Sequence, residues 1–495
     1  MSKLIIQNGN MCELDLPLKF AQKLYNEFAI RHPNAFYLRT RQRGMQNWDG
    51  KIHYITKTGQ FKIGLLPKVY DMCIEMGIKP KVVDMRQPLP KVSKVVTNIG
   101  KYKLRPEQEK AVKSVINNRV GDTPFHIGVL DYTVNAGKTL IMSSLYLTYK
   151  KQLKTLLITN DSDWLNQARE EFKQYLPGED ITFVQGKVLN WSNFTIGMVQ
   201  SISRNMRFYQ KELSQIDMVL VDEADQGGSK QYQNVITRLF NTRIRIGLSG
   251  TIYMSKLAKD KVKNMNLECF FGKVIAEFKL KDSIKKGYST KTIVKMVPGK
   301  PWYGNWESDC ISYKEIYDDS ITENNTAWTM AYNRLRWNIN QGRYPALVVC
   351  KHIAHCENLY KFFKKKLGDA YNIAYVHVNT SSKLRQQIMK DFREGKIDIL
   401  VSTTIIARGK NFPKLKYLLN TASMDSREKS IQFLGRLVRT DESKNKVYLD
   451  DLHYPGNYLD RHGKHRKQYY QRQELKVILL DKLWKKHPNH SLIKS

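Results

Sequence analysis

The chain has 495 residues, of which 82 are Lys or Arg and 46 are Asp or Glu, for a formal net charge of +36. With 41% hydrophobic and 26% charged residues, the composition excludes a disordered chain and indicates globular domains, about three at ~100–200 residues each. The basic excess favours a polyanionic partner such as nucleic acid over a merely basic enzyme or a membrane-surface binder.

Residues 1–98 are predicted to form a small α+β accessory domain that binds nucleic acid. Between Arg31 and Lys62, seven Lys or Arg accompany one acid, and aromatic residues lie among these charges, as is typical of nucleic-acid surfaces. The aromatic residues are Phe36, Tyr37, Trp48 and Tyr54. For Trp48, packing in a β-hairpin and contact with a base stay equally open. A proline-containing stretch from residue 87 to about 100 predicts a linker.

Residues 99–285 and 286–455 are predicted to form two successive α/β lobes. Apolar runs with the length of buried strands alternate with helix-length segments of polar pattern, which favours βαβ units and parallel sheets. The runs are residues 155–158, 195–199, 218–221 and 244–248, then 346–349, 373–378, 397–401 and 417–420. Residues 456–495 are rich in Lys and Arg, and we expect a basic C-terminal tail there.

A candidate phosphate loop lies at residues 134–139, after the apolar run 127–130 and before an apolar, helix-like stretch. Lys138 would neutralise phosphate charge, and the Thr139 hydroxyl would ligate Mg²⁺. The residues expected to offer backbone N–H groups to the phosphates are Asn135, Ala136 and Gly137. Tyr132 departs from the full pattern, which requires glycine at that position. A surface turn would explain an isolated Gly-Lys-Thr triplet, but the strand–loop–helix context favours a phosphate site.

Two adjacent acids follow the apolar run 218–221, at the strand end where α/β sheets bind ligands. Asp222 would hold Mg²⁺ through its water shell, and Glu223 would orient and deprotonate the attacking water. The alternative is a solvated acidic turn. Because acids are scarce in this chain, the addition of Asp225 at the same strand end favours a site that hydrolyses nucleoside triphosphate.

Near the end of the second lobe, Gln432, Arg436 and Arg439 recur at i, i+4 and i+7, which predicts one face of a helix. Such a face could present two guanidinium groups to a γ-phosphate held by the other lobe, so that hydrolysis would depend on lobe closure. A solvated basic face is the alternative for this segment taken alone. Its place after the phosphate loop and the acids favours the first interpretation.

Taken in chain order, these motifs resemble those of the superfamily 2 helicases, specifically the phage UvsW-type DNA helicases, over most of the chain. Arg105 and Gln108 lie in a segment that looks like the adenine-reading Q motif. The phosphate loop looks like motif I and Asp222-Glu223-Ala224-Asp225 like motif II. Other segments resemble motifs Ia (160–167), Ib (197–201), III (249–251), IV (348–352), V (402–411, with Gly409) and VI (432–439). Residues 47–51, Asn-Trp-Asp-Gly-Lys, resemble an element of UvsW-type N-terminal domains.

The resemblance implies two RecA-like lobes, a site for ATP and Mg²⁺ that includes Gly409 and Gln432, and ATP-dependent helicase or translocase activity. The expected substrate is duplex or branched DNA, with a single strand in the cleft, in replication, recombination or repair. RNA in RNA–DNA hybrids is kept open as a partner. An RNA helicase, a restriction-type motor subunit and a nucleic-acid-binding protein with a vestigial ATPase stay open as alternatives. We expect a monomer without a membrane partner.

The cysteines show neither C-x-x-C pairing nor zinc-finger spacing, which indicates reduced thiols and a cytoplasmic protein, in the host cytoplasm if the chain is phage-encoded. Cys350 and Cys356 lie close to His352 and His355. A metal site there stays open, although buried core cysteines explain the pattern better. We find no signal-peptide pattern at the N-terminus and no apolar run of ~18 residues.

Overall fold

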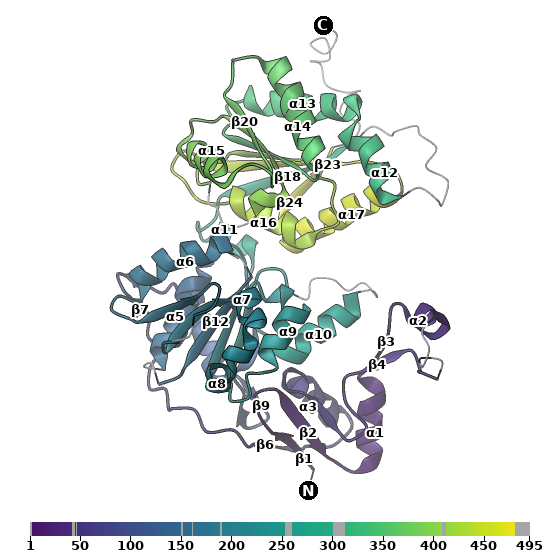
Figure 1. The fold of residues 1–495 in the computed structure, drawn as a ribbon, viewed down its shortest axis with the longest axis vertical. Helices are drawn as coiled ribbons and strands as arrows, with labels where there is room; N and C mark the ends of the chain where they lie inside the picture. The colour runs from purple at the N-terminus through teal and green to yellow at the C-terminus, as the bar shows by residue number, and fades with distance from the viewer. Residues whose placement is uncertain are drawn as a thin grey trace. The chain divides into compact units, whose positions relative to one another are not determined.

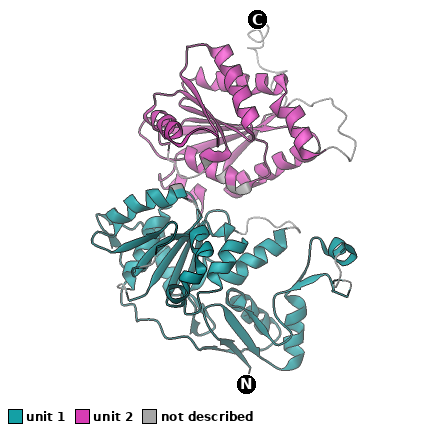
Figure 2. Ribbon diagram, in the orientation of Figure 1, with its two compact units in different colours: residues 1–278 teal, residues 279–495 magenta. Residues whose placement is uncertain are grey.

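The computed structural model contains two compact units, residues 1–278 and residues 279–495 (Figure 1, Figure 2). It describes residues 2–41, 45, 47–149, 152–160, 162–188, 191–252, 260–299, 312–407 and 412–480. Each unit contains one seven-stranded parallel sheet. A small α+β domain precedes the first of these sheets, which confirms the predicted fold class. None of the helices in the described ranges is long and apolar enough to span a bilayer.

The N-terminal domain has a four-stranded sheet of order β5-β2-β1-β6. Buried and less buried residues alternate along β1 and β2, because only one face of the sheet packs on the core. A separate hairpin of β3 and β4 carries the short helix α2. The bounds are β1 Lys3–Ile6, β2 Met11–Asp15, α1 Leu18–Glu27, β3 Ala29–Arg31, α2 Ala35–Arg41, β4 Lys51–His53, β5 Gln60–Lys62, α3 Leu66–Glu75 and β6 Lys81–Asp84.

The first lobe has strand order β13-β14-β12-β15-β16-β11-β17. Strands β11, β12, β15 and β16 are buried along their whole length, because parallel strands in the middle of such a sheet are covered on both faces. The strands are β11 Ile127–Tyr132, β12 Thr155–Thr159, β13 Ile181–Val184, β14 Phe194–Met198, β15 Met218–Asp222, β16 Ile244–Ser249 and β17 Val274–Phe278. The helices are α4 Pro106–Ile116, α5 Lys138–Thr148, α6 Ser162–Tyr175, α7 Val199–Arg204, α8 Gln210–Ser214, α9 Lys230–Ile236 and α10 Lys261–Phe271, with a 3₁₀ turn at Met206–Phe208 after α7.

A buried arginine joins the N-terminal domain to the first lobe. The Arg245 side chain, in β16, is fully buried, and its Nη2 donates to the carbonyl oxygen of Gly9 at 2.6 Å and to Oδ1 of Asn10 at 2.8 Å. Burial lowers the pKa of Arg245 to about 9. Gly9 itself has no room for a side chain, since a Cβ would lie 2.5 Å from the carbonyl oxygen of Leu239. The two parts that the sequence separates at residue 98 therefore share one compact unit and one hydrophobic core.

The second lobe has strand order β20-β21-β19-β22-β23-β18-β24. The strands are β18 Lys291–Pro298, β19 Ala346–Cys350, β20 Ile373–Val376, β21 Ile399–Thr403, β22 Tyr417–Asn420, β23 Lys446–His453 and β24 Lys476–Leu479. The helices are α11 Leu280–Lys285, α12 Tyr313–Tyr317, α13 Asn325–Ile339, α14 Ile353–Leu367, α15 Ser382–Glu394, α16 Arg427–Leu437 and α17 Asn457–Arg472.

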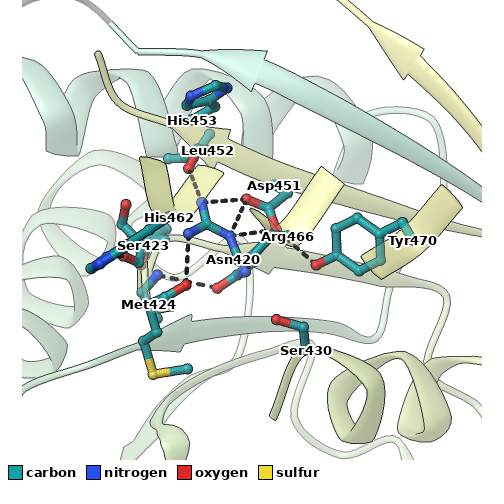
Figure 3. Close-up of polar contacts among 12 residues, drawn as sticks. Asn420, Ser423, Met424, Ser430, Asp451, Leu452, His453, His462, Arg466 and Tyr470 are labelled. Atoms are coloured by element: carbon teal, nitrogen blue, oxygen red, sulfur yellow. Dashed lines mark hydrogen bonds and ion pairs between the residues drawn. The ribbon is translucent and has the colours of Figure 1, made fainter. Parts of the chain in front are cut away.

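The expectation of a basic tail from residue 456 is wrong for residues 457–479. This stretch folds as α17 and as β24, the edge strand that pairs in parallel with β18. Figure 3 shows the reason: Arg466 is fully buried, donates to both carboxylate oxygens of Asp451 in β23, and also donates to the carbonyl oxygen of Met424 at 2.9 Å. The Asp451 carboxylate also accepts hydrogen bonds from Asn420 and Tyr470. The Arg466 guanidinium, which the basic composition placed in a tail, is therefore part of the core of the second lobe.

Candidate nucleotide site and nucleic-acid surface

The predicted phosphate and metal residues of unit 1 meet at one edge of its sheet. Strands β15, β16 and β11 are neighbours in parallel, and their register pairs Asp222 with Leu248 and Asp131 with Ser249. The carboxyl ends of the three strands therefore lie side by side. The phosphate loop, the two adjacent acids and the segment 249–251 follow these ends directly, so the fold brings together what the sequence spreads over about 120 positions.

The phosphate loop makes a sharp turn before α5. Asn135 and Gly137 have φ angles of 65° and 70°, in the left-handed region, and Lys138 is the first residue of the helix. Lys138 and Thr139 are half-buried. The helix therefore directs its unpaired backbone N–H groups and its partial positive charge toward the loop, as a phosphate site requires.

The segment around Gln108 is tied to this loop. Gln108 is 1% exposed; its Oε1 accepts from the N–H of Arg105 at 2.8 Å, and its Nε2 donates to the carbonyl oxygen of Ala136 at 2.9 Å. The amide keeps one further N–H and one further lone pair that an adenine edge could use. Tyr132, the residue that departs from the phosphate-loop pattern, adds a second tie: its hydroxyl donates to the carbonyl oxygen of Glu107 at 2.8 Å. The departure thus joins the two segments that are predicted to bind nucleotide.

Two side chains of the loop fit phosphate and hydrated Mg²⁺. The hydroxyl of Thr133 and the amide oxygen of Asn135 are buried and have no hydrogen-bond partner among the described residues. A hydroxyl can donate to a phosphate oxygen, and an amide oxygen can accept from water around a cation. Because unsatisfied buried polar groups cost free energy, these atoms indicate a polar ligand at this position. Thr133 was missed by the sequence motif, which does not specify that position.

Asp222 at the end of β15, and Glu223 directly after it, lie at the sheet edge where the metal and the attacking water are expected. Asp222 is the buried last residue of the strand, and Glu223 has a φ angle of 51°, which turns the chain sharply. Ser249 Oγ donates to Oδ1 of Asp225 at 2.7 Å and lies 3.1 Å from the hydroxyl of Thr251. The segment that resembles motif III is therefore bonded directly to the segment that resembles motif II.

A series of amides extends from Glu223 along the same sheet edge. Gln226 Nε2 donates to Oε2 of Glu223 at 3.3 Å, and Gln226 Oε1 accepts from Nδ2 of Asn160. The carbonyl oxygen of Asn160 accepts from Nε2 of Gln200 at 3.3 Å. The sequence places Asn160 and Gln200 in the segments that resemble motifs Ia and Ib, and it gives no signal for Gln226. The distance of 66 positions between Asn160 and Gln226 leaves no local signal for this contact.

In unit 2, α16 contains Gln432 and Arg436 but ends at Leu437. Arg439 therefore lies beyond the helix, and the expectation that a single helical face carries both arginines is wrong for this residue. The backbone explains the end: the carbonyl oxygens of Val438 and Arg439 accept from the N–H of Thr290 at 2.8 Å and from its hydroxyl at 3.0 Å. Both arginines are half-buried. Gly409 lies outside the described residues.

A buried lysine fixes the end of α16 and was not anticipated. Lys444 Nζ donates to the carbonyl oxygen of Leu437 at 3.0 Å and to that of Leu415 at 2.8 Å. Burial lowers the pKa of Lys444 to about 8. The side chain supplies hydrogen bonds to a helix end whose carbonyl groups have no partner within the helix, which positions the last turn that carries Arg436.

The Cys350–Cys356 region packs as core. Cys350 in β19 and Cys356 in α14 are fully buried in the hydrophobic cluster of unit 2. His355 is also buried, its Nδ1 lies 3.2 Å from the hydroxyl of Tyr317, and burial lowers its pKa to about 3. Within the part of the chain that the structure describes, no three His, Cys, Asp or Glu side chains form a group that could hold a metal ion.

The described residues of the hairpin β3–β4 and of α2, which are 29–41, 45 and 47–53, are basic and aromatic, and we call them the arm. Phe36 is 79% exposed and Tyr37 52% exposed, and the Arg41 guanidinium lies 4.9 Å from the centre of the Tyr37 ring. Trp48 is half-buried, and its Nε1 donates to the carbonyl oxygen of Lys51 at 2.9 Å. The sequence left two roles open for Trp48, packing in the hairpin and contact with a base. This bond supports packing in the hairpin. Among the described residues of this segment, Phe36 and Tyr37 are the strongly exposed aromatic side chains.

Two family models match the chain, one in each compact unit. The family described as "Type III restriction enzyme, res subunit" matches residues 101–254, and the family described as "Helicase conserved C-terminal domain" matches residues 331–441. The first stretch contains the phosphate loop, Asp222 and Glu223, and the second contains α16 and Arg439. The two matches occur in the order that the motifs predict.

Similar proteins extend these matches. The "Putative ATP-dependent helicase IRC3" of Saccharomyces cerevisiae is 22% identical over 378 residues, which cover 70% of this chain and 51% of that protein. The chain thus spans about half the length of this relative. The DNA-bound ATP-dependent Type ISP restriction-modification enzyme LlaBIII is 13% identical with a TM-score of 0.57, covering 86% of this chain and 35% of that chain. The crystal structure of T4 UvsW is 19% identical with a TM-score of 0.45, and the match covers 97% of this chain and 98% of that chain.

Proposed function

We propose that the chain is an ATP-dependent helicase or translocase of superfamily 2 that acts on duplex or branched DNA in replication, recombination or repair. The observation that carries this proposal is the sheet edge of unit 1, where the phosphate loop, Asp222 and Glu223 follow neighbouring strands. This edge has the groups that hydrolysis of a phosphoanhydride requires: a cation, a metal ligand and a base.

Each group at this edge has one role in the proposal. Lys138 neutralises charge on the phosphates, while Thr139 and Asp222 hold Mg²⁺, which when bound supplies further charge neutralisation. Glu223 orients the attacking water and takes its proton. The remaining nucleotide contacts are assigned to Arg105, Gln108, Asn135, Ala136, Gly137, Gly409 and Gln432. Arg436 and Arg439 of unit 2 stabilise the charge that develops on the γ-phosphate.

DNA is the proposed polymer because of the N-terminal domain. Its arm exposes Phe36 and Tyr37 together with Arg39 and Arg41, so it offers stacking surfaces beside phosphate-binding cations. The resemblance of residues 47–51 to an element of UvsW-type domains supports DNA over RNA. The net charge of +36 supports a polyanion of either kind.

The test is ATP hydrolysis without nucleic acid and then with single-stranded DNA, forked DNA and RNA, all at one salt concentration, because the affinity of such proteins falls steeply with salt. We expect forked DNA to stimulate hydrolysis more than RNA does, and strand displacement on the fork to require ATP. Stimulation by RNA alone would replace the proposal with an RNA helicase. Hydrolysis that responds to no nucleic acid would contradict both.

The arm offers a matched pair of variants. Replacing Phe36 and Tyr37 by alanine removes two stacking surfaces and should raise the forked-DNA concentration for half-maximal stimulation by about tenfold or more. Leu18→Ala is the control, since Leu18 is 82% exposed and apolar but lies on α1, outside the arm. Equal affinity of the arm variant and this control would exclude the arm from the DNA-binding surface.

A further inference from the structure

The exposed Trp337 of unit 2 is surrounded by cations. It lies in the last turn of α13 and is 38% exposed. Lys295 Nζ lies 4.6 Å from the centre of its ring, and the guanidinium carbons of Arg334 and Arg343 lie 5.0 Å and 4.9 Å from it. The Arg343 guanidinium also lies 3.6 Å from the centre of the Tyr448 ring. Three cations thus meet at two aromatic rings, and part of the Trp337 ring is open to a ligand.

The strand register extends this group across one face of the sheet. Lys295 in β18 pairs with Asp450 in β23, and Tyr448, two residues before Asp450, shares their face because the side chains of a strand alternate. By the same register, the exposed Lys446 and Lys476 lie on this face, at the first positions of β23 and β24. We define residues 295, 337, 343, 446, 448 and 476 as the α13 surface.

The charges of the α13 surface are not balanced by acids. Asp450 is fully buried, and its Oδ2 accepts from Nε and Nη2 of Arg334 at 2.8 Å and 2.6 Å, so this carboxylate is matched to Arg334. Burial lowers the pKa of Lys295, and the nearby Arg334 and Arg343 lower it further, against the effect of Asp450. Like charges that are held together in this way favour the binding of an anion. Four cations of the surface form no salt bridge within the described part of the chain: Lys295, Arg343, Lys446 and Lys476.

The α13 surface lies on the opposite face of the sheet from α16. Asp450 and Asp451 are adjacent in β23, so their side chains point to opposite faces. Arg334 of α13 binds the first carboxylate, and Arg466 of α17 binds the second. Helix α17 packs against α16, which carries Arg436, and Figure 1 shows α13 and α17 on the two sides of the sheet. A ligand on the α13 surface is therefore separate from the helix that carries a candidate γ-phosphate arginine.

The chemistry of the α13 surface favours a single strand of nucleic acid over other polyanions. Cations alone would suit an acidic peptide equally well, but an accessible indole ring beside them adds a stacking surface for a base. In a duplex the bases are already stacked on one another, whereas a single strand offers its bases to such a ring. The cations extend over four positions of the register, from Lys446 to the level of Lys295, which is about 13 Å at ~3.3 Å per residue. This length suits a strand with several phosphates.

We propose that the α13 surface binds single-stranded DNA, with a base stacked on Trp337 and phosphates at the cations around it. The inference goes beyond the proposed function, because it assigns to unit 2 a DNA contact that requires neither ATP nor the arm. It rests on the proposed function only in taking DNA as the polymer. On a forked substrate, this contact gives the displaced strand a place to bind.

The experiment measures the affinity of the full chain, without ATP, for a fluorescent oligonucleotide of about 30 deoxythymidines, which is longer than one typical binding site. Anisotropy titrations are repeated at several salt concentrations. The variants are Trp337→Ala, Trp337→Phe, and Lys446→Gln with Lys476→Gln. Because both lysines are exposed, their replacement should leave the fold intact.

Helix α15 supplies the matched controls. Leu384 is 54% exposed and apolar, so Leu384→Ala removes an exposed apolar side chain outside the α13 surface. Lys383 and Lys390 are exposed on the same helix, so Lys383→Gln with Lys390→Gln removes the same number of charges from another part of unit 2.

The two kinds of contact predict different changes. Trp337→Ala should raise the dissociation constant by about fivefold or more, because a stacking surface is lost, and should leave its salt dependence unchanged. Trp337→Phe should keep most of the affinity. The variant of Lys446 and Lys476 should reduce the slope of log affinity against log salt by about 1.4, at ~0.7 for each phosphate contact to a single strand. The α15 variants should change neither quantity.

Three results would overturn the inference: wild-type affinity of Trp337→Ala, an equal change of slope in the two double-lysine variants, or no binding of the oligonucleotide by the wild-type chain. Thermal unfolding of each variant establishes that the fold is retained, and the exposed lysines still test the surface if Trp337→Ala does not fold. Since the titrations contain no ATP, they are independent of the proposed function. Hydrolysis that responds to no nucleic acid would contradict that function and leave the result on the α13 surface intact.

Discussion

The two lobes have one topology and two different sets of residues at the ends of their strands. Numbered from its first strand, each sheet has the same order, so β11 in the first lobe corresponds to β18 in the second. In the first lobe, the loop after the first strand carries Lys138 and has buried oxygens without a partner in the described chain. The second lobe supplies arginines on and after α16. The shared topology positions strand ends, and the residues placed there determine the chemistry.

The buried charges differ as well. Arg245 of unit 1 donates to neutral oxygens of Gly9, Asn10 and Phe270, whereas Arg466 of unit 2 pairs with the carboxylate of Asp451. The first arrangement joins two domains, and the second joins the C-terminal helix to its own sheet (Figure 3). The same side chain thus acts between domains in one unit and within a domain in the other.

The largest effect is expected from a change in the phosphate loop of the first lobe. Lys138→Ala should abolish ATP hydrolysis, because it removes the cation that neutralises the phosphates, and should spare DNA binding, because the arm and the rest of the basic surface remain. Hydrolysis and DNA affinity, measured at one salt concentration, check this. Unchanged turnover would contradict the assignment of the phosphate loop.

Arg439→Ala tests the second lobe. ATP should still bind to the first lobe, whereas hydrolysis stimulated by DNA should fall by about 10³-fold, as for the loss of an arginine that stabilises the γ-phosphate. Nucleotide binding by equilibrium titration and DNA-stimulated turnover measure the two effects separately. If stimulation persists, Arg439 does not serve as the finger, and Arg436→Ala then becomes the variant that tests the other candidate.

Arg466→Ala should destabilise unit 2 more than unit 1. Removing one partner leaves the Asp451 carboxylate buried without its guanidinium, which typically costs about 3–5 kcal/mol. Hydrogen exchange of β23 against β15 measures the two units separately. Replacing both partners, Arg466→Met with Asp451→Leu, should recover much of the loss. Equal losses in β23 and β15 would mean that the ion pair does not act locally.

Acid should also affect the units differently, through His355. Burial lowers the pKa of His355 to about 3, from about 6.5 in an unfolded chain, so the unfolded state binds a proton first as pH falls. Its contribution to stability is complete above pH 6.5 and is lost progressively between pH 6.5 and pH 3, with on the order of 2 kcal/mol lost by pH 5. His355→Phe should reduce this pH dependence in unit 2. An unchanged slope would assign the acid sensitivity to other groups.

The features that the sequence predicted are those with local signals. The apolar runs, the strand–loop–helix context of Lys138 and the acids after β15 each depend on adjacent residues, and the structure places them as expected. Features that depend on distant partners were missed. Arg466 was assigned to a tail because its partner Asp451 comes from another element. Arg439 was placed on a helix that ends before it, at Leu437, where the distant Lys444 and Thr290 hold the chain. Gln226 gave no signal, because only the fold brings it to Asn160.

The contact between Arg245 and Gly9 has a consequence for how this chain can be divided and inherited. A shortened chain that begins at residue 99 would lose both the carbonyl oxygen of Gly9 and the amide oxygen of Asn10. The Arg245 guanidinium would lose these two acceptors and would lie at the apolar surface that the N-terminal domain now covers. The nucleotide-binding lobe is therefore not a portable module. A gene fusion, deletion or exchange that separates it from the arm-bearing domain would have to replace Arg245 at the same time, so the two parts should be gained and lost together.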